Sequence, residues 1–329
     1  MKRILLLTFF LILIQEFTAM DYKPVPMEIT LEPVRINNTD ALTAIRLQET
    51  SDRKQPVLFY SLKGQKESDP ALTLYALTLE KKAQPELVKT IAEAGFIPEW
   101  DILPKDKKNY SLIYNDARGF SCPLILDALK IGETGFFTEK LPYGSFSNPR
   151  FIRNSNPGSF IISTICDIKK LMVFKSDKSY KEVCKANLAR ILPRKEGYMV
   201  FIKRNIDGAA KNNIPRGLLT AFRTDKEFGK PEKTLLPFED MNILEFSVAA
   251  ADNLFILFAT TIQGYVIYGF TLDKAGKTLF HEEIPWEKSL SEPEILILKK
   301  TAVIAIMESP QAPGTRVLSA KWDITRFME

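Results

Sequence analysis

The stretch from residue 243 to residue 272, ILEFSVAAADNLFILFATTIQGYVIYGFTL, decides how this chain folds. It is strongly apolar, yet it carries Glu245, Asp252, Asn253 and Gln263 and is rich in β-branched and aromatic residues. That composition is typical of paired strands and not of a membrane-spanning helix. We therefore predict strands at 243–247, 254–260 and 265–272, and no membrane span beyond the N-terminal segment.

The same arrangement recurs along the chain, in pattern and not in identity. Six apolar segments start about 49 residues apart on average, at 57–62, 111–114, 160–165, 198–203, 254–260 and 302–307. Each is preceded by a short strand, at 42–47, 100–103, 150–153, 189–192, 243–247 and 294–298. A second apolar strand follows each segment after a polar loop, and a weaker fourth strand closes most units. Four short antiparallel strands per unit predict an all-β, six-bladed β-propeller, because stacked blades bury the faces that one blade leaves exposed. A β-sandwich or a pair of smaller sheets is the alternative.

The two ends of the repeat complement each other. The last unit lacks a fourth strand, whereas an alternating segment, Met27 to Ile36, precedes the first unit. Pairing these two would remove edges that are otherwise open to aggregation. We therefore predict that the N-terminal strand is the outer strand of the last blade, which contains 302–307, and closes the ring.

The N-terminus has the features of an export signal. Lys2 and Arg3 precede an apolar run from Ile4 to Ile14, which is too short to span a bilayer. Ala19 is a plausible last residue before cleavage. We predict a signal peptide at 1–19, one propeller domain at 20–329 and a periplasmic or extracellular location, with a retained signal anchor as the alternative.

The bulk composition excludes several functions. A formal charge of +5 is spread along the chain without a basic block, which argues against nucleic-acid binding. With three cysteines, no Cys/His cluster and His281 as the single histidine, we expect neither a metal site nor a cofactor. We predict that Cys166 and Cys184 are not bonded, because strand spacing places them about 9–10 Å apart. We also expect a monomer.

Acidic turns follow the third strand of most units, at Glu80, Asp177, Asp225, Asp273 and Asp323. Their position resembles that of the Asp box in sialidase-like and other sugar-active propellers, most closely in 218–236, LLTAFRTDKEFGKPEKTLL. No full Ser-x-Asp-x-Gly-x-x-Trp box is present. The carboxylate of such a turn accepts backbone N–H bonds, so the resemblance implies a fold and not catalysis. A sialidase-like site would need three arginines, a Tyr/Glu nucleophile pair and an Asp acid; the candidates by type are Arg46, Arg150, Arg190, Tyr114, Glu245 and Asp101.

The innermost strands should line a central funnel. The predicted register places there Arg46, Asp101, Arg150, Arg153, Arg190, Glu245 and Glu294. Such residues can clamp an anion, pair with one another, or supply two carboxylates for glycoside hydrolysis. Two aromatics in proline-containing loops, Tyr143 and Trp286, are further candidates for ligand contact.

From these residues we favour a binding propeller over an enzyme. Arg46, Arg150, Arg190, Tyr143 and Trp286 are the predicted ligand-binding residues, with a polysaccharide or an envelope or secreted protein as partner. The alternative is a sialidase-like glycoside hydrolase, for which Asp101, Glu245 and Glu294 are the catalytic candidates.

Overall fold

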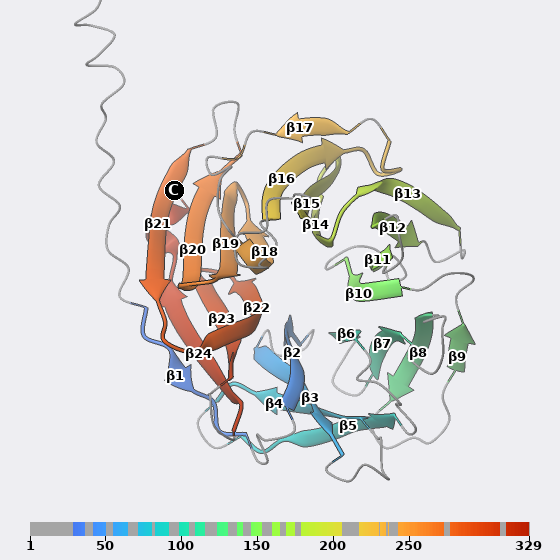
Figure 1. Cartoon of the computed structure of the whole chain (residues 1–329), viewed down its shortest axis with the longest axis vertical. Coiled ribbons are helices and arrows are strands. Elements are labelled where there is room, and N and C mark those ends of the chain that lie inside the picture. Colours follow the sequence, from blue (N-terminus) through green and yellow to red (C-terminus); the bar gives the residue numbers. More distant parts are fainter. Residues whose placement is uncertain are drawn as a thin grey trace, which may run out of the picture.

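The chain folds into antiparallel sheets arranged in a ring (Figure 1). The computed structural model describes residues 29–36, 42–50, 55–64, 72–80, 83–91, 99–104, 109–115, 124–130, 137–140, 146–152, 160–164, 169–174, 179–205, 217–229, 231–234, 236, 243–272, 277–309 and 314–328. Within these ranges the strands form six four-stranded sheets, and the one helical element is a 3-10 turn, η2 (Thr325–Phe327). The predicted all-β class and propeller architecture are confirmed.

The sheets follow one another along the chain, and we number them as blades 1 to 6. Blade 1 consists of β2 (Leu42–Glu49), β3 (Pro56–Lys63), β4 (Leu72–Thr78) and β5 (Glu86–Ile91). Blade 2 consists of β6 (Trp100–Pro104), β7 (Asn109–Asn115), β8 (Leu124–Lys130) and β9 (Phe137–Lys140). Blade 3 consists of β10 (Phe146–Phe151), β11 (Phe160–Thr164), β12 (Lys170–Phe174) and β13 (Tyr180–Lys185).

The second half of the ring repeats this order. Blade 4 consists of β14 (Leu188–Arg194), β15 (Gly197–Asn205), β16 (Gly217–Thr224) and β17 (Glu232–Thr234). Blade 5 consists of β18 (Ile243–Ala251), β19 (Leu254–Thr261), β20 (Gly264–Thr271) and β21 (Thr278–Pro285). Blade 6 consists of β22 (Ser289–Leu298), β23 (Thr301–Ser309), β24 (Arg316–Asp323) and the N-terminal β1 (Glu32–Pro33). The first strand of each blade lies nearest the centre (Figure 1).

The hydrophobic core lies between neighbouring blades. Phe201 of blade 4 and Phe246, Phe255 and Phe270 of blade 5 belong to one fully buried cluster, in which Phe255 and Phe270 stack with centroids 5.7 Å apart. A second cluster joins blade 5 to blade 6. Each apolar face is therefore covered by the next blade, which is the reason the units fold as a ring.

The N-terminal strand is part of blade 6. In β1, Glu32 pairs with Ser319 and Pro33 with Leu318, and Val34 N–H donates to the carbonyl oxygen of Val317 at 2.8 Å. The segment therefore adds an outer strand to β24 and does not pair with β2. The signal-peptide prediction for 1–19 lies outside the described residues.

Two acidic turns behave as the resemblance implied. The Asp225 carboxylate accepts backbone N–H bonds from Glu227 at 2.9 Å and Gly229 at 2.7 Å, which fixes the turn between β16 and β17. The carboxylate of Asp323 likewise accepts the N–H of Thr325 at 2.7 Å. These carboxylates hold turns, and neither lies on an innermost strand.

Two innermost strands start earlier than predicted. β10 and β22 begin at Phe146 and Ser289, several residues before the predicted starts, because each continues through a proline by forming a bulge. The short fourth strand of blade 4, β17, was not predicted. Cys184 is a half-buried free thiol, whereas Cys122 and Cys166 lie outside the described residues.

Candidate functional site

The innermost strands bring four of the predicted residues together at the centre of the ring. Arg46, Asp101, Arg150 and Glu294 come from blades 1, 2, 3 and 6, and each is buried, with 2–7% of its surface exposed. Buried charges persist in proteins only when they are paired or hydrogen-bonded. We call this group, together with Glu292, the funnel cluster.

Arg46 is the best-satisfied member of the funnel cluster. Its Nε donates to the backbone oxygen of Trp100 at 3.0 Å and lies 3.7 Å from Asp101 Oδ1. Its Nη1 bonds to Glu292 and lies 3.9 Å from Glu294 Oε1. Burial alone would lower the pKa of Arg46, but the negative charges of Glu292, Glu294 and Asp101 outweigh burial and raise it. Arg46 is therefore a fixed cation that holds three blades together.

Arg150 pairs with the opposite side of the ring. Its Nη2 lies 3.7 Å from Glu292 Oε2 and 3.6 Å from Glu294 Oε1. Blades 3 and 6 face each other across a six-membered ring, so these ion pairs span the centre. Among the described residues, Nε and Nη1 of Arg150 have no hydrogen-bond partner, although both atoms are buried. Such unsatisfied donors are rare in folded proteins and point to a partner such as ordered water or a ligand.

A repeated tetrapeptide shapes these two opposed strands. Ser147-Asn148-Pro149-Arg150 in β10 and Ser291-Glu292-Pro293-Glu294 in β22 each contain a one-residue bulge. The residue before proline has a positive φ in both, 50° for Asn148 and 51° for Glu292. Non-glycine residues adopt this conformation at a cost, and such strain is concentrated at functional sites. The bulges turn a charged side chain toward the centre.

A carboxylate of the preceding blade holds each bulge. Glu245 Oε2 accepts the backbone N–H of Glu292 at 2.6 Å, and Glu99 accepts that of Asn148. Burial raises the pKa of Glu245, and the charge of Glu292 adds to this effect. Burial also raises the pKa of Glu99. Glu245 was predicted in the funnel, whereas Glu99 and Glu292 were missed; the signal that could have found them is the repeated Ser-x-Pro-x tetrapeptide.

Arg190 lies at the side of the funnel cluster. Its Nη1 donates to the carbonyl oxygen of Ala189 at 2.9 Å, and its Cζ lies 5.7 Å from the centre of the Phe246 ring. It makes no ion pair with any described residue. Burial lowers the pKa of Arg190, although the charges of Glu294 and Glu292 act in the opposite direction. Its remaining donors are available to a ligand.

The other predicted site residues do not join the cluster. Trp286 is half-buried, donates its indole N–H to the carboxylate of Glu308 at 3.0 Å and packs near Tyr265. Tyr143 and Arg153 lie outside the described residues. Tyr114 is buried in the hydrophobic cluster between blades 1 and 2, so it cannot form a nucleophile pair with Glu245.

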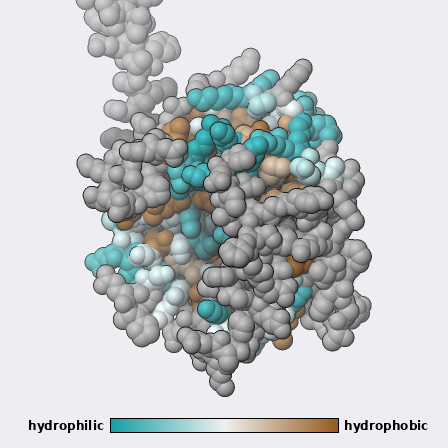
Figure 2. Space-filling view, turned by 45° about the vertical axis from the view of Figure 1, so that its right-hand side comes forward, coloured by the Kyte–Doolittle hydropathy of each residue, from teal (hydrophilic) through white to brown (hydrophobic). Residues whose placement is uncertain are grey.

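The described ranges contain no group of three or more His, Cys, Asp or Glu side chains able to hold a metal ion. Within the same ranges, no helix has the length and apolar character to cross a bilayer. On the face shown in Figure 2, hydrophilic residues gather over the upper part, and apolar residues show mainly in recesses between polar ones.

Comparison with known proteins identifies the fold. No family model and no curated protein matches the chain. Among solved structures, a sialidase from Trypanosoma rangeli superposes on 90% of this chain with a TM-score of 0.57 and 8% identity. The same sialidase in complex with sialic acid superposes on 91% with a TM-score of 0.54 and 8% identity. The fold is that of the sialidase propeller. The chain spans about 60% of the first sialidase and 58% of the second.

In this propeller, the residues named from the resemblance divide into two groups. Arg46, Arg150 and Asp101 lie together at the centre of the ring. Both arginines, however, are already paired with carboxylates of the same chain. Together with the buried position of Tyr114, this arrangement differs from the expected catalytic set.

Proposed function

We propose that this protein is a binding propeller that holds an uncharged, hydroxyl-rich ligand, a glycan, in its central funnel. The observation that carries the proposal is the pair of buried Arg150 donors, Nε and Nη1, for which the described residues provide no acceptor. Two ligand oxygens would be needed to satisfy them, one for each donor, because Nε–H and the Nη1–H bonds point away from different edges of the planar guanidinium. The half-buried Arg190 offers further donors on the adjacent wall.

The charge balance of the cluster favours a neutral ligand. The cations Arg46 and Arg150 already lie within 4.0 Å of Asp101, Glu292 or Glu294. A carboxylate or sulfate would have to enter beside these fixed negative charges, which is unfavourable at short range. A sugar hydroxyl both donates and accepts, so it can bond to the arginines and to the carboxylates at once.

A glycoside hydrolase is the second candidate, and one observation favours it. The pKa values of Glu245 and Glu99 are raised by burial, which is the direction required of a general acid at neutral pH. Each of these carboxylates, however, accepts the N–H of a bulge, a task that positions the backbone. We therefore favour binding.

We further propose that the protein acts outside the cytoplasm, after removal of residues 1–19. The apolar run of the first 14 residues and the basic pair before it support this. The mass of the mature protein, recovered from the periplasmic or culture fraction, tests it. A mass that includes residues 1–19 would contradict cleavage.

Arg150→Lys is the variant that tests funnel binding. It keeps the positive charge beside Glu292 and Glu294 but removes the Nε and Nη1 donors. Affinity for neutral oligosaccharides (hexasaccharides of glucose, mannose, xylose and N-acetylglucosamine) should be measured by isothermal titration calorimetry. We expect Arg150→Lys to weaken binding about tenfold, because two hydrogen bonds at ~0.5–1.5 kcal/mol each are lost.

The matched control is Arg204→Lys, at an exposed position on β15. It should bind as the unmodified protein does. Equal affinity of Arg150→Lys and the control would contradict the proposal. Release of shorter sugars during the same titrations, lost in Glu245→Gln, would favour the hydrolase instead.

A further inference from the structure

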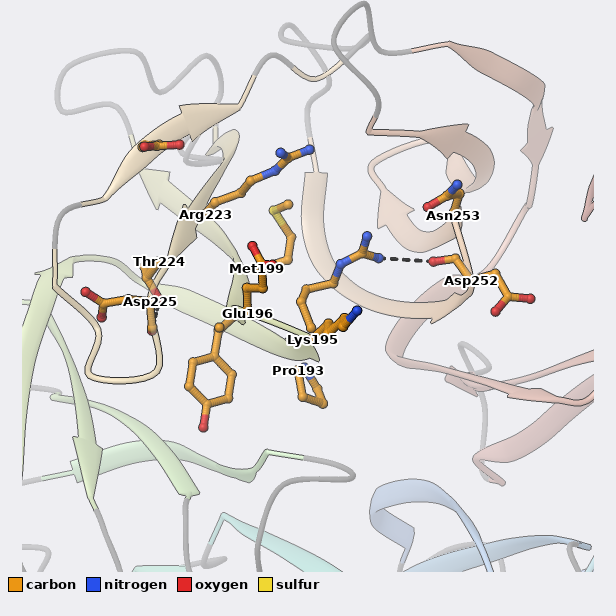
Figure 3. Close-up of a pocket in the computed structure, with 13 residues that line it drawn as sticks. Pro193, Lys195, Glu196, Met199, Arg223, Thr224, Asp225, Asp252 and Asn253 are labelled. Atoms are coloured by element: carbon orange, nitrogen blue, oxygen red, sulfur yellow. Dashed lines mark hydrogen bonds between the residues drawn. The ribbon is translucent and has the colours of Figure 1, made fainter.

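A large cavity lies between blades 4 and 5, on the side of the ring where their first hairpins turn (Figure 3). It has a volume of about 1010 Å³ and is lined by three elements: the β14–β15 hairpin, the β16–β17 turn region and the β18–β19 turn. In Figure 3, Arg223 and Asp225 lie on one side of it and Asp252 and Asn253 on the other. This volume is at the upper end of the range for small-molecule sites. We call it the hairpin cavity.

The hairpin cavity is separate from the funnel cluster. Glu245 lies near the start of β18, and Asp252 follows the last residue of that strand. Seven residues of extended chain separate them by about 23 Å. Along β14, likewise, Arg190 precedes the turn residue Arg194. The hairpin cavity therefore lies at the turn ends of β14 and β18, farther along these strands than Arg190 and Glu245.

The lining carries positive and negative side chains, and no ion pair joins them among the described residues. Seven charged side chains line the cavity, three basic and four acidic. Among the described residues, none of the seven forms an ion pair, although ion pairs occur elsewhere in the chain. Paired side chains would have to exchange a partner before they could bind, so the absence of ion pairs leaves donors and acceptors available on the side chains other than Asp225, whose carboxylate already accepts two backbone N–H bonds.

Two arginines are held in place by single bonds to backbone oxygens. Arg194 Nη1 donates to Asp252 at 3.1 Å, and its Cζ lies 5.1 Å from the centre of the Phe255 ring. Arg223 Nη2 donates to the carbonyl oxygen of Leu272. Each guanidinium therefore keeps most of its five donors while its orientation is restricted. Such preorganisation lowers the entropic cost of binding.

A rigid aromatic forms part of the wall. The ring of Tyr198 stacks on Phe228 with centroids 4.4 Å apart and an interplanar angle of 7°. Phe228 belongs to the turn that the Asp225 carboxylate fixes. A flat ring next to hydrogen-bonding groups suits a ligand with an apolar face and a polar edge.

We infer that the hairpin cavity is a second glycan-binding site, which takes a neutral oligosaccharide. Each sugar hydroxyl can accept from Arg194 or Arg223 and donate to Glu232 or Asp252, so the mixed lining is used fully. An anionic glycan would meet four carboxylates, and a cationic ligand would meet three basic groups. The inference concerns a site distinct from the funnel and holds whether or not the funnel binds a ligand.

Two exposed positions allow a test without disturbing the fold. Arg223→Gln removes one of the basic groups of the lining, and Glu232→Gln removes one of its carboxylates. Both residues are exposed. Binding of the four neutral hexasaccharides named above should be measured by isothermal titration calorimetry for the full chain and for each variant. We expect each variant to weaken binding about 3- to 10-fold, in keeping with the loss of one or two hydrogen bonds.

Controls separate this site from the funnel and from charged ligands. Arg204→Gln, exposed on the same blade, should leave binding unchanged. Arg150→Lys weakens the funnel contribution about tenfold, so binding whose affinity it leaves unchanged and Arg223→Gln lowers belongs to the hairpin cavity. Affinity should change less than twofold between 50 and 500 mM NaCl, because a neutral ligand is not screened.

Three results would overturn the inference. One is the absence of binding by all four hexasaccharides at millimolar concentration. Another is binding that Arg150→Lys abolishes and Arg223→Gln and Glu232→Gln leave intact, because all binding would then belong to the funnel. The third is affinity that falls steeply with salt, which would indicate a charged ligand such as a peptide.

Discussion

Arg46→Met should lower the free energy of unfolding by about 3–5 kcal/mol at pH 7, because it removes a buried cation that lies beside Asp101, Glu292 and Glu294, although Arg150 still pairs with the two glutamates. Arg46 lies 3.7 Å from Asp101 and 3.9 Å from Glu294, and both acids are at most 3% exposed. At such a distance an ion pair contributes roughly 4 kcal/mol of attraction at an effective dielectric constant of 20.

Differential scanning calorimetry at pH 7 and pH 4 provides the assay. For a chain of this size, the expected loss lowers Tm by roughly 4–7 °C at pH 7. At pH 4 the difference should shrink by at least half, because the carboxylates then protonate at little cost. The double variant Arg46→Met/Glu294→Gln should recover part of the loss. Arg204→Met, which removes an exposed arginine, is the control and should change Tm by less than 2 °C. A loss below 1 kcal/mol, or one equal at both pH values, would refute the reasoning.

Single substitutions at Glu245, Glu308 and Gly197 test other parts of the structure. Burial, with the charge of Glu292, raises the pKa of Glu245, so stability should fall as pH rises from the ordinary carboxyl value through the raised one. Glu245→Gln should thus raise Tm at pH 8 and leave it unchanged at pH 4, and an unchanged Tm at both pH values would contradict this. Burial would raise the pKa of Glu308, but its bonds from Arg316 and Trp286 outweigh burial and lower it. Its stabilisation is then present above the ordinary carboxyl pKa and lost in acid, so Glu308→Gln should cost about 1.5–3 kcal/mol in urea unfolding at pH 7 and little at pH 3. In Gly197→Ala the new Cβ would lie 1.9 Å from the Thr224 carbonyl oxygen at a φ of 150°, so the variant should lose about 1–3 kcal/mol or more, and a wild-type Tm would show that the hairpin adjusts freely.

Local patterns predicted most of the fold. The predicted strands at 243–247, 254–260 and 265–272 correspond to β18, β19 and β20, because apolar strands and polar turns alternate over short distances there. The closure by the N-terminal segment followed from matching a missing strand with a spare one. The starts of β10 and β22 were predicted too late, since Pro149 and Pro293 resemble breaks in a strand unless a bulge is foreseen.

The site was predictable only where a strand keeps its register. Arg46, Asp101, Arg150 and Glu294 could be placed near the centre, because they lie on innermost strands. Glu292 could not, since it occupies the bulge, where the alternation of side chains fails. The pairing of Arg150 with blade 6 depends on closure of the whole ring, and no local pattern carries that information. The hydrogen bond between Trp286 and Glu308 was not predicted, because Glu308 lies 22 residues farther along the chain.

The central claim is that Arg150 completes its hydrogen bonds with a ligand in the funnel. A crystal structure of the full chain with the tightest-binding neutral hexasaccharide tests this most directly. We predict sugar oxygens within about 3.2 Å of Arg150 Nε and Nη1, with the ion pairs to Glu292 and Glu294 intact. An empty funnel, with these two donors bonded to protein atoms or to water while the sugar lies elsewhere, would contradict it.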